Sequence, residues 1–482
     1  MRIDTLHIDA RMYIVRLQTG LQQAIRTNLK EEKMKKVIAL LLTLMMILSL
    51  AACAAAPAKE TNSETTAPAA QENTTETDVP NDVAPGAEYE GKSIQIMFNS
   101  DDTWNDVIDN YAKAAIAEAF PGLNVEFVPL QDVPVETLAT VGELPDIWFG
   151  TVSTAQIEAG ICLDLKPYLS DWFTENFNNP NFYNDSKGRV WAVGSGTDTF
   201  YTSVYYYNKD VFAACGLEAP KNFDDLLNIC QILQDNGYDI PLSHSGWTTS
   251  VYWLEQAIVC YDPEAYADLM ANKTDFNDPR IRAAIANIQQ LVDMGALGIG
   301  TVEKDATASI SEFVEGKAPI MSTMSWNSGA IAGQTDFEVG QFFLPSANEA
   351  YPSGAAYTCW GSFLNGWSVS ASTEDPELTV AVLKTLIEQE AKRNFDNGLV
   401  TNYKVDGEIA FVNDLDADRY EMFKNVTTWG SAFYPNALDA NSQTEYFSVI
   451  NEWLMDDSDM TADDVCDAMQ AIWEQNTFFE VF

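Results

Sequence analysis

Short runs of alternating hydrophobic and polar positions begin after residue 91, and they predict strands and helices in turn. The predicted strands are Ser93–Phe98, Asn124–Val128 and Asp146–Phe149. Between the first two, Asn105–Phe120 has apolar residues at helical spacing and ends at a Pro-Gly pair. A short helical piece precedes the third strand. This order is typical of a parallel sheet with right-handed crossovers, so we expect an α/β fold.

The rest of the chain is predicted to be mostly helical, with short strands between the helices. The helices expected from the pattern are Phe223–Gln234, Asp278–Met294, Thr307–Glu315, Pro376–Gln389 and Ala462–Trp473. The strands expected are Ser203–Tyr207, Ala318–Ser322, Glu338–Phe343 and Gly366–Ser370. No period of a solenoid repeat is present.

One apolar run near the N-terminus has the pattern of an export signal. Lys35 and Lys36 precede the stretch Val37–Leu50, which ends in Leu50-Ala51-Ala52-Cys53. This ending resembles a bacterial lipobox, in which the cysteine thiol accepts a diacylglycerol group. We therefore expect residues 34–52 to be a lipoprotein signal peptide and Cys53 to be lipidated. Two or more acyl chains, a palmitate among them, would anchor the chain stably at the outer face of the cell membrane. An ordinary signal peptide with an incidental cysteine is the alternative.

Residues on either side of this signal carry further expectations. Because residues 1–33 precede a complete signal, we expect Met34 to be the true initiator and residues 1–33 not to be translated. Residues 53–90 are rich in Ala, Thr, Glu, Pro and Asn, with almost no large apolar side chain. Such a segment cannot bury enough surface to fold, so we expect a disordered tether.

The charge balance limits the partners. The chain has 71 Asp and Glu against 27 Lys and Arg, a formal net charge of −44. Such a surface repels phosphate backbones, so we expect no nucleic-acid partner. Only two histidines, His7 and His244, are present, which leaves little material for histidine-based catalysis or metal binding. We expect no cofactor and no metal. The six cysteines after Cys53 lack any CxxC spacing, and they are interpreted as free buried thiols, with disulfides as the alternative.

Several segments of the chain form a set when they are taken together. They are GELPDIWFG at 142–150, GICLDLKPYL at 160–169, KGRVWAVG and YYYNKDVFAACGL within 187–217, KNFDDLLNICQILQ at 221–234, FVEGKAPIMSTMSW at 313–326 and GWSVS at 366–370. Each is weak alone, but in this order and spacing, from about residue 91 to 482, they resemble a known family, the extracellular solute-binding proteins of the maltodextrin and multiple-sugar type.

The resemblance implies a periplasmic-binding-protein fold (type II) of two α/β lobes with a ligand cleft between them. The first lobe would be 91–200 plus 362–412, and the second 201–361 plus 413–482, with a hinge near Tyr201, Trp360 and Phe411. It also implies a binding protein rather than an enzyme, which would deliver a di- or oligosaccharide to the permease subunits of an ABC importer. We expect a monomer that touches the membrane only through its lipid anchor.

Candidate ligand-binding residues come from two sources. Ligands in open α/β sheets lie beyond the carboxyl ends of the strands. That rule selects the loops that carry Asn99, Asp101, Asp102, Trp104, Gly150, Thr151 and Ser153. The resemblance adds Asp198, Tyr201, Trp247, Trp326, Trp360, Trp429 and Tyr434. Aromatic rings cover the apolar face of a pyranose, and carboxylate, amide and hydroxyl oxygens accept its hydroxyl protons.

Other interpretations remain open at this stage. A secreted glycosidase would also be acidic and aromatic-rich, although no motif singles out a carboxylate pair. A polyamine or polyol could be the solute, and a surface adhesin is a further class. Trp326 could instead be a core residue, Asp146 could be structural, and His244 could contact the ligand. The run Asp414–Asp418 resembles the start of a calcium loop but lacks the glycine and glutamate that such a loop requires.

Overall fold

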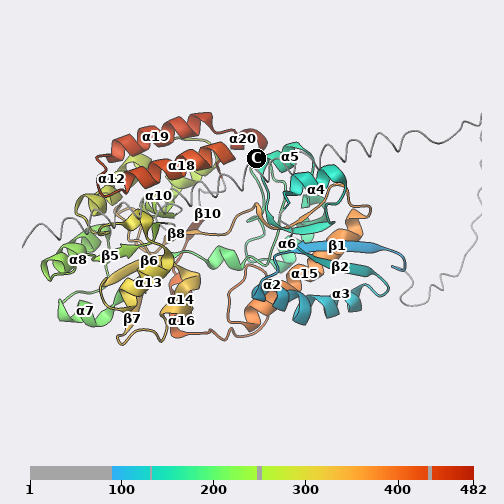
Figure 1. Cartoon of the computed structure of the whole chain (residues 1–482), viewed down its shortest axis with the longest axis horizontal. Helices are drawn as coiled ribbons and strands as arrows, with labels where there is room; N and C mark the ends of the chain where they lie inside the picture. The colour runs from blue at the N-terminus through green and yellow to red at the C-terminus, as the bar shows by residue number, and fades with distance from the viewer. Residues whose placement is uncertain (1–88, 131–132, 247–251, 432–436) are drawn as a thin grey trace, which may run out of the picture. The chain divides into compact units, whose positions relative to one another are not determined.

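The computed structural model describes residues 89–482, except 131–132, 247–251 and 432–436 (Figure 1). The expectations for residues 1–33, for the signal 34–52, for Cys53 and for the tether as far as residue 88 therefore lie outside the described residues. At the start of the described part, the ring of Tyr89 packs edge-on against Phe120, with 5.6 Å between the centroids. Within the described ranges, no helix is both long and apolar enough to cross a bilayer.

The first sheet has the strand order β2-β1-β3-β9. Its parallel strands are β1 (Ser93–Phe98), β2 (Asn124–Pro129) and β3 (Ile147–Thr151), and β9 (Asn365–Val369) pairs with β3 in the antiparallel direction. Ile94 and Ile96 of β1 are buried, and Ser93 and Gln95, which alternate with them, are exposed, as the alternating pattern predicts. The parallel pairing predicted for the first three strands is confirmed.

Helices before, between and after these strands pack around the sheet. They are α2 (Asp102–Asp106), a π-helical segment η1 (Val107–Ala112), α3 (Lys113–Ala119), α4 (Val135–Val141), α5 (Thr154–Glu158), α6 (Lys166–Asn176) and α15 (Pro376–Asp396). The first helical run starts at Asp102 rather than at Asn105, because the Asp101 carboxylate accepts the Trp104 backbone N–H at 2.9 Å and caps the helix. Asp146 accepts bonds from the Gln95 backbone and the Thr373 hydroxyl, which agrees with a structural role.

The second sheet has the order β5-β6-β4-β7. Its strands are β4 (Ser203–Asn208), β5 (Leu242–His244), β6 (Ile320–Met324) and β7 (Val339–Phe342). Tyr205 and Tyr206 point to opposite faces of β4, and both are buried, so both faces of this sheet are covered. His244 is buried against the rings of Tyr205 and Trp253, and burial lowers its pKa to about 3. This places His244 in the core.

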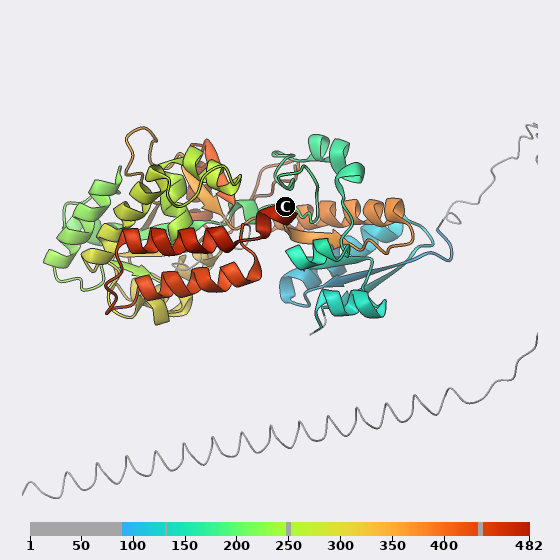
Figure 2. The same ribbon diagram turned by 90° about the horizontal axis from the view of Figure 1, so that it is seen from above.

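The helices around the second sheet are α7 (Lys209–Ala214), α8 (Phe223–Asp235), α10 (Leu254–Tyr261), α11 (Pro263–Met270), α12 (Pro279–Asp293), α13 (Ala306–Val314), α14 (Ser328–Ile331), α16 (Asp414–Phe423), α18 (Ala440–Trp453), α19 (Ala462–Gln475) and α20 (Phe478–Val481), with short 3-10 turns between some of them. Helices α18 and α19 lie side by side (Figure 2). A small sheet pairs β8 (Ala356–Cys359) with β10 (Thr428–Ser431). The calcium-like run at 414–418 is the first turn of α16, which Asn413 caps.

Two crossings connect the first sheet to the second, and they run side by side. The Trp360 backbone N–H donates to the Tyr201 carbonyl at 2.7 Å, and the Gly361 N–H donates to the Asp198 carbonyl at 3.0 Å. A Cβ atom at position 361 would lie 3.0 Å from the Thr199 nitrogen, so only glycine fits this close approach. The crossings therefore form a hydrogen-bonded unit between the sheets.

The six cysteines after Cys53 are all free. Cys215 is partly buried, and the other five are buried. The free-thiol interpretation is therefore confirmed.

Candidate functional site

A cavity of about 460 Å³ lies beside the crossings, at the carboxyl end of β3 and the start of β9. Helix α2, strands β3 and β9 and the end of α15 contribute one part of its lining. The crossing segments contribute another part, and Trp326, which follows β6, contributes from the second sheet. The volume is within the range of about 300–1,000 Å³ that is usual for small-molecule sites.

Aromatic rings form two groups around this cavity. Trp104 of α2 packs against Phe149 and Trp367, with 4.3 and 5.2 Å between the centroids. Trp326 meets Tyr201 and Trp360 edge-on, at 5.4 and 5.9 Å. Trp326 keeps 40% of its surface exposed, which is unusual for a side chain of this size and marks it as available to a ligand.

A buried carboxyl group, Glu390, supports the wall of the cavity. Its Oε1 accepts the Ser195 hydroxyl at 2.6 Å and the Ser195 backbone N–H at 3.2 Å, and its Oε2 accepts the Trp367 indole N–H at 2.9 Å. Asn394 donates to the hydroxyls of Ser195 and Thr197. Burial raises the pKa of Glu390 even though these hydrogen bonds favour its ionised form. Both oxygens of Glu390 are therefore used within the protein.

A second carboxyl group, Asp198, lies in the first crossing and lines the same cavity. Burial and the nearby Glu390 carboxyl raise the pKa of Asp198 to about 7, against the opposing effect of a hydrogen bond from Asn365. The Asn365 Oδ1 atom accepts the Thr151 hydroxyl at 3.2 Å, which leaves the Asn365 amide N–H groups to face Asp198. Asp198 makes no ion pair with the described residues, so it can accept hydrogen bonds from a ligand.

Arg393 supplies a positive charge at the edge of the cavity. Its Nε lies 2.8 Å from the Asp106 Oδ2 atom in a partly buried ion pair. Hydrogen bonds from Asn110 and Arg393 lower the pKa of Asp106.

In the part of the chain that the structure describes, no group of three or more His, Cys, Asp or Glu side chains could hold a metal ion. The arrangement provides rings for a flat apolar surface and oxygen and nitrogen atoms for hydroxyl groups.

Residues 103–403 match the family model described as bacterial extracellular solute-binding protein. The matched range covers more than half of the chain and holds most of the lining of the cavity. The chain belongs to this family. The family resemblance expected from the sequence is therefore confirmed, and its members are binding proteins rather than enzymes.

A curated relative of this solute-binding protein is YcjN of Escherichia coli (strain K12), which carries the provisional name of an ABC transporter periplasmic-binding protein. The two are 27% identical over 156 residues, which is 30% of this chain and 35% of YcjN. The match thus spans about a third of the relative's length.

Solved structures share the fold over nearly their whole length. A chitin oligosaccharide binding protein is 21% identical, with a TM-score of 0.61, over 80% of this chain and 98% of that one. A Streptococcus pneumoniae solute-binding protein in complex with the blood group A-trisaccharide is 16% identical, with a TM-score of 0.60, over 80% of this chain and all of that one. A Streptomyces coelicolor protein, described provisionally as a secreted solute-binding lipoprotein, has a TM-score of 0.63 at 16% identity and covers 79% and 98% of the two chains. These likenesses confirm the two-lobe α/β fold class.

Five of the candidate residues of this solute-binding protein line one cavity: Trp104, Asp198, Tyr201, Trp326 and Trp360. Trp104 was selected by the strand-end rule, and the other four by the family resemblance. The two sources therefore meet at the same place in the fold.

Other candidates from the strand-end loops do not line the cavity. Asp101 caps α2, and Ser153 caps α5 in a reciprocal capping box with Gln156. Asn99 lies two residues before the Asp101 cap, Asp102 is the first residue of α2, and Gly150 is paired with Gly366 between β3 and β9. Thr151 does not line the cavity itself, but its hydroxyl group donates a hydrogen bond to Asn365, which does.

The remaining candidates are Trp429, Trp247, Tyr434 and Cys53. The backbone of Trp429 lies in β10, opposite Tyr357 of β8. Trp247, Tyr434 and Cys53 lie outside the described residues.

Several lining residues were not anticipated from the sequence. They are Phe149, Thr197, Asn365, Glu390, Arg393 and Asn394. One signal for the segment before Asp198 was present in the run Gly194-Ser195-Gly196-Thr197. Gly196 has φ of +73°, and a Cβ there would lie 2.4 Å from the Asn402 Cβ, so the tight turn requires glycine. Nothing in the local sequence marks Glu390 or Arg393, because both lie in an otherwise ordinary helix.

Proposed function

We propose that the chain is the lipid-anchored, extracellular solute-binding component of an ABC importer and that it captures a di- or oligosaccharide. The observation that carries this proposal is the combination of aromatic walls and polar groups in one cavity. Trp104 contributes on one side, Trp326 and Trp360 on the other, and Asp198 lines the same space. A sugar ring needs both features, because it has an apolar C–H face and a rim of hydroxyl groups.

Relatives of known structure support the choice of ligand class. Proteins with the same fold are named for a chitin oligosaccharide, for raffinose and for a blood group trisaccharide. Each is less than 25% identical to this chain, so the likeness supports the fold and leaves the identity of the sugar to experiment.

The proposal assigns roles to the two sheets and to the N-terminus. The first sheet belongs to a lobe of residues 91–200 plus 362–412, and the second to a lobe of 201–361 plus 413–482. The crossings near Tyr201 and Trp360 act as the hinge, together with the chain near Phe411. Cys53 holds the monomeric protein at the membrane, and the lobes deliver the sugar to the permease.

A hydrolytic function has less support. Glycoside hydrolysis needs two carboxyl groups that face the bond to be cleaved. Asp198 and Glu390 are the carboxyl groups among the described lining residues, but both oxygens of Glu390 already accept bonds from Ser195 and Trp367. We therefore expect reversible binding without cleavage of a radiolabelled oligosaccharide.

A basic solute such as a polyamine is the second candidate. Asp198 lines the cavity without a cationic partner among the described residues, and an ammonium group could occupy that place. The aromatic walls suit a sugar better, since a linear polyamine offers no flat face.

The test is a thermal-shift screen of the purified protein with neutral oligosaccharides, amino sugars, polyols and polyamines, followed by calorimetry. A ligand at about 100 times its Kd stabilises the folded state by about 2.7 kcal/mol. Trp326→Ala should weaken sugar binding by about 1–3 kcal/mol, the range known for stacking of flat ligands, with little change in melting temperature. Met455→Ala is the control, because Met455 is also exposed but lies outside the cavity. Stabilisation by polyamines alone, or equal binding losses in both variants, would contradict the proposal.

A further inference from the structure

The last residues of the chain form a further connection between the two sheets, next to the second crossing. Helix α20 and Phe482 follow α19, which packs with α18 and α12 beside the second sheet. Yet α20 contacts α5, which follows β3 of the first sheet (Figure 1). We refer to residues 478–482 as the C-terminal strap.

The start of the strap is held on the second-sheet side. The Thr477 backbone N–H donates to Asp439, the N-cap residue of α18, at 2.8 Å, and Asn476 Oδ1 accepts the Asp439 backbone N–H at 3.0 Å. The ring of Phe479 packs against Trp473 of α19, with 5.0 Å between the centroids. These contacts hold the start of the strap against α18 and α19.

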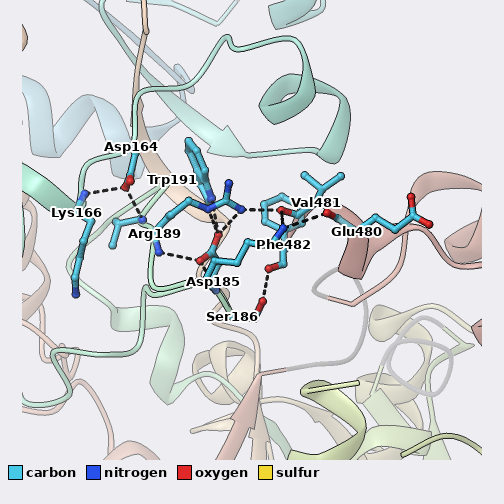
Figure 3. Close-up of polar contacts among 11 residues, drawn as sticks. Asp164, Lys166, Asp185, Ser186, Arg189, Trp191, Glu480, Val481 and Phe482 are labelled. Carbon is cyan, nitrogen blue, oxygen red and sulfur yellow. Dashed lines mark hydrogen bonds and ion pairs between the residues drawn. The ribbon is translucent and has the colours of Figure 1, made fainter. Parts of the chain in front are cut away.

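The end of the strap is held on the first-sheet side by side chains that bond to its backbone carbonyls (Figure 3). Lys187 Nζ donates to the carbonyls of Glu480 at 3.1 Å and Val481 at 2.8 Å. Arg189 Nη2 donates to the Val481 carbonyl at 2.7 Å, and the Ser186 hydroxyl donates to the main-chain oxygen of Phe482.

Within their own loop, Asp185 holds the Arg189 guanidinium and the backbone of Lys187. Asp185 accepts the Arg189 Nε–H at 2.8 Å, the Trp191 indole N–H at 3.0 Å and the backbone N–H groups of Lys187 and Arg189. The Arg189 guanidinium also lies over the Trp191 ring, 4.7 Å from its centroid. Because these contacts hold the Arg189 guanidinium, docking of the strap requires little further ordering of this donor.

Apolar contacts link the strap to the wall of the cavity. Phe478 and Phe482 are buried, lie 4.6 Å apart and pack against Phe363, at 6.4 and 5.9 Å between centroids. Phe363 belongs to the second crossing, between Trp360 and Asn365, and both of these line the cavity. The strap thus contacts the segment that carries two lining residues without lining the cavity itself.

We propose that the C-terminal strap is an additional, non-covalent connection between the lobes, which holds the crossing at 360–365 in the arrangement that receives the ligand. The consequence for binding rests on the function proposed above. Without the strap, the crossing would sample more conformations, and the ligand would have to order it on binding. Apparent affinity falls by the fraction of molecules in which the site is formed.

Hydrogen exchange measured by mass spectrometry tests the strap without any ligand. The variants are a chain that ends at Thr477, Lys187→Ala and Phe482→Ala, and the matched control is Lys221→Ala, whose ammonium group pairs with Glu218 on the surface. In the truncated chain we expect exchange in peptides that cover 360–365 to rise at least fivefold. The two point variants should show smaller rises, and the control none. If the truncated chain fails to fold, the point variants decide.

Calorimetry with the sugar found in the screen tests the effect on binding. The truncated chain should bind 3- to 30-fold more weakly, and the control should bind as the unaltered protein does. Unchanged exchange at 360–365, or an increase confined to residues 185–191, would overturn the proposal, as would unchanged affinity. If no sugar binds the unaltered protein, the proposed function fails, and the exchange data still decide whether the strap holds the crossing.

Discussion

Replacing Asp198 with Asn should remove one contribution to the pH dependence of the free energy of unfolding. The carboxyl group of Asp198 is partly buried at the cavity, where burial and the Glu390 carboxyl raise its pKa to about 7 from an ordinary 3.8. The unfolded chain loses this proton near pH 4, whereas the folded protein keeps it up to about pH 7. The folded state therefore binds more protons between these values, and the free energy of unfolding falls as the pH rises through this window. Above pH 7 the contribution of Asp198 is constant.

The size of the effect follows from the two pKa values. Their difference makes the folded protein hold the proton roughly a thousandfold more tightly than the unfolded chain, a limit of about 4 kcal/mol. Because the cavity admits water to Asp198, we expect about 1–3 kcal/mol. Asn has nearly the same shape as Asp and does not ionise, so D198N should lack this dependence.

Urea unfolding followed by circular dichroism from pH 4.5 to 8.5 measures the effect as a difference between two proteins. The difference is needed because His244 also titrates: its pKa of about 3 makes the unaltered protein lose stability as the pH falls below the ordinary value of about 6.5. The free energy of unfolding of the unaltered protein, minus that of D198N, should fall by about 1–3 kcal/mol as the pH rises. Asp457→Asn, at an exposed position outside the cavity, should show no such trend.

A difference that does not change with pH would refute the reasoning about Asp198. Ligand binding provides a second measurement. The ionised carboxylate is the better acceptor for sugar hydroxyl groups, so affinity for a neutral sugar should rise as the pH increases through 7. D198N should bind more weakly and without that rise.

Two further predictions concern anchoring and closure. Cys53→Ala should release the protein from membranes or block its processing, because Cys53 is the proposed lipid acceptor; firm retention after detergent-free washing would contradict the anchor. Saturating sugar should lower the radius of gyration in small-angle X-ray scattering, because the ligand touches both lobes; an unchanged radius would contradict closure.

Local pattern was sufficient for most strands, for several of the longer helices and for the parallel direction of the first three strands, but it missed others such as α6, α10 and α11. Pairings between residues that lie far apart in the sequence were harder to predict. β9 enters the first sheet beside β3 from much later in the chain, and only this pairing brings Asn365 next to Thr151. Helix α18 was not anticipated because its polar sequence weakens the helical signal, although Tyr446, Ile450 and Trp453 are buried on one face.

The residues of the candidate site also divide into those that could be predicted from the sequence and those that could not. The strand-end rule found Trp104, but it also selected Asp101 and Ser153, whose oxygens cap helices. Asp and Ser are favoured both at helix starts and in ligand sites, so residue type alone does not separate the two roles. For Ser153, the spacing to Gln156 was a capping-box signal in the sequence itself. Whether Glu390 and Arg393 face the cavity depends on how the last turns of α15 are oriented, and only the folded chain determines that orientation.

We expect different residues of the cavity to determine ligand affinity and lobe closure. Asp198, Tyr201 and Trp360 lie in crossings that are hydrogen-bonded to each other, so their mutual positions should change little when the lobes move. Trp104 comes from the first-sheet side and Trp326 from the second. A ligand shifts a conformational equilibrium only through contacts that differ between the two states. Contacts with the crossings should therefore set affinity in either state, and simultaneous contact with Trp104 and Trp326 should drive closure. We accordingly expect D198N to reduce affinity yet still close at saturating sugar, whereas Trp326→Ala should bind with a smaller change in radius of gyration.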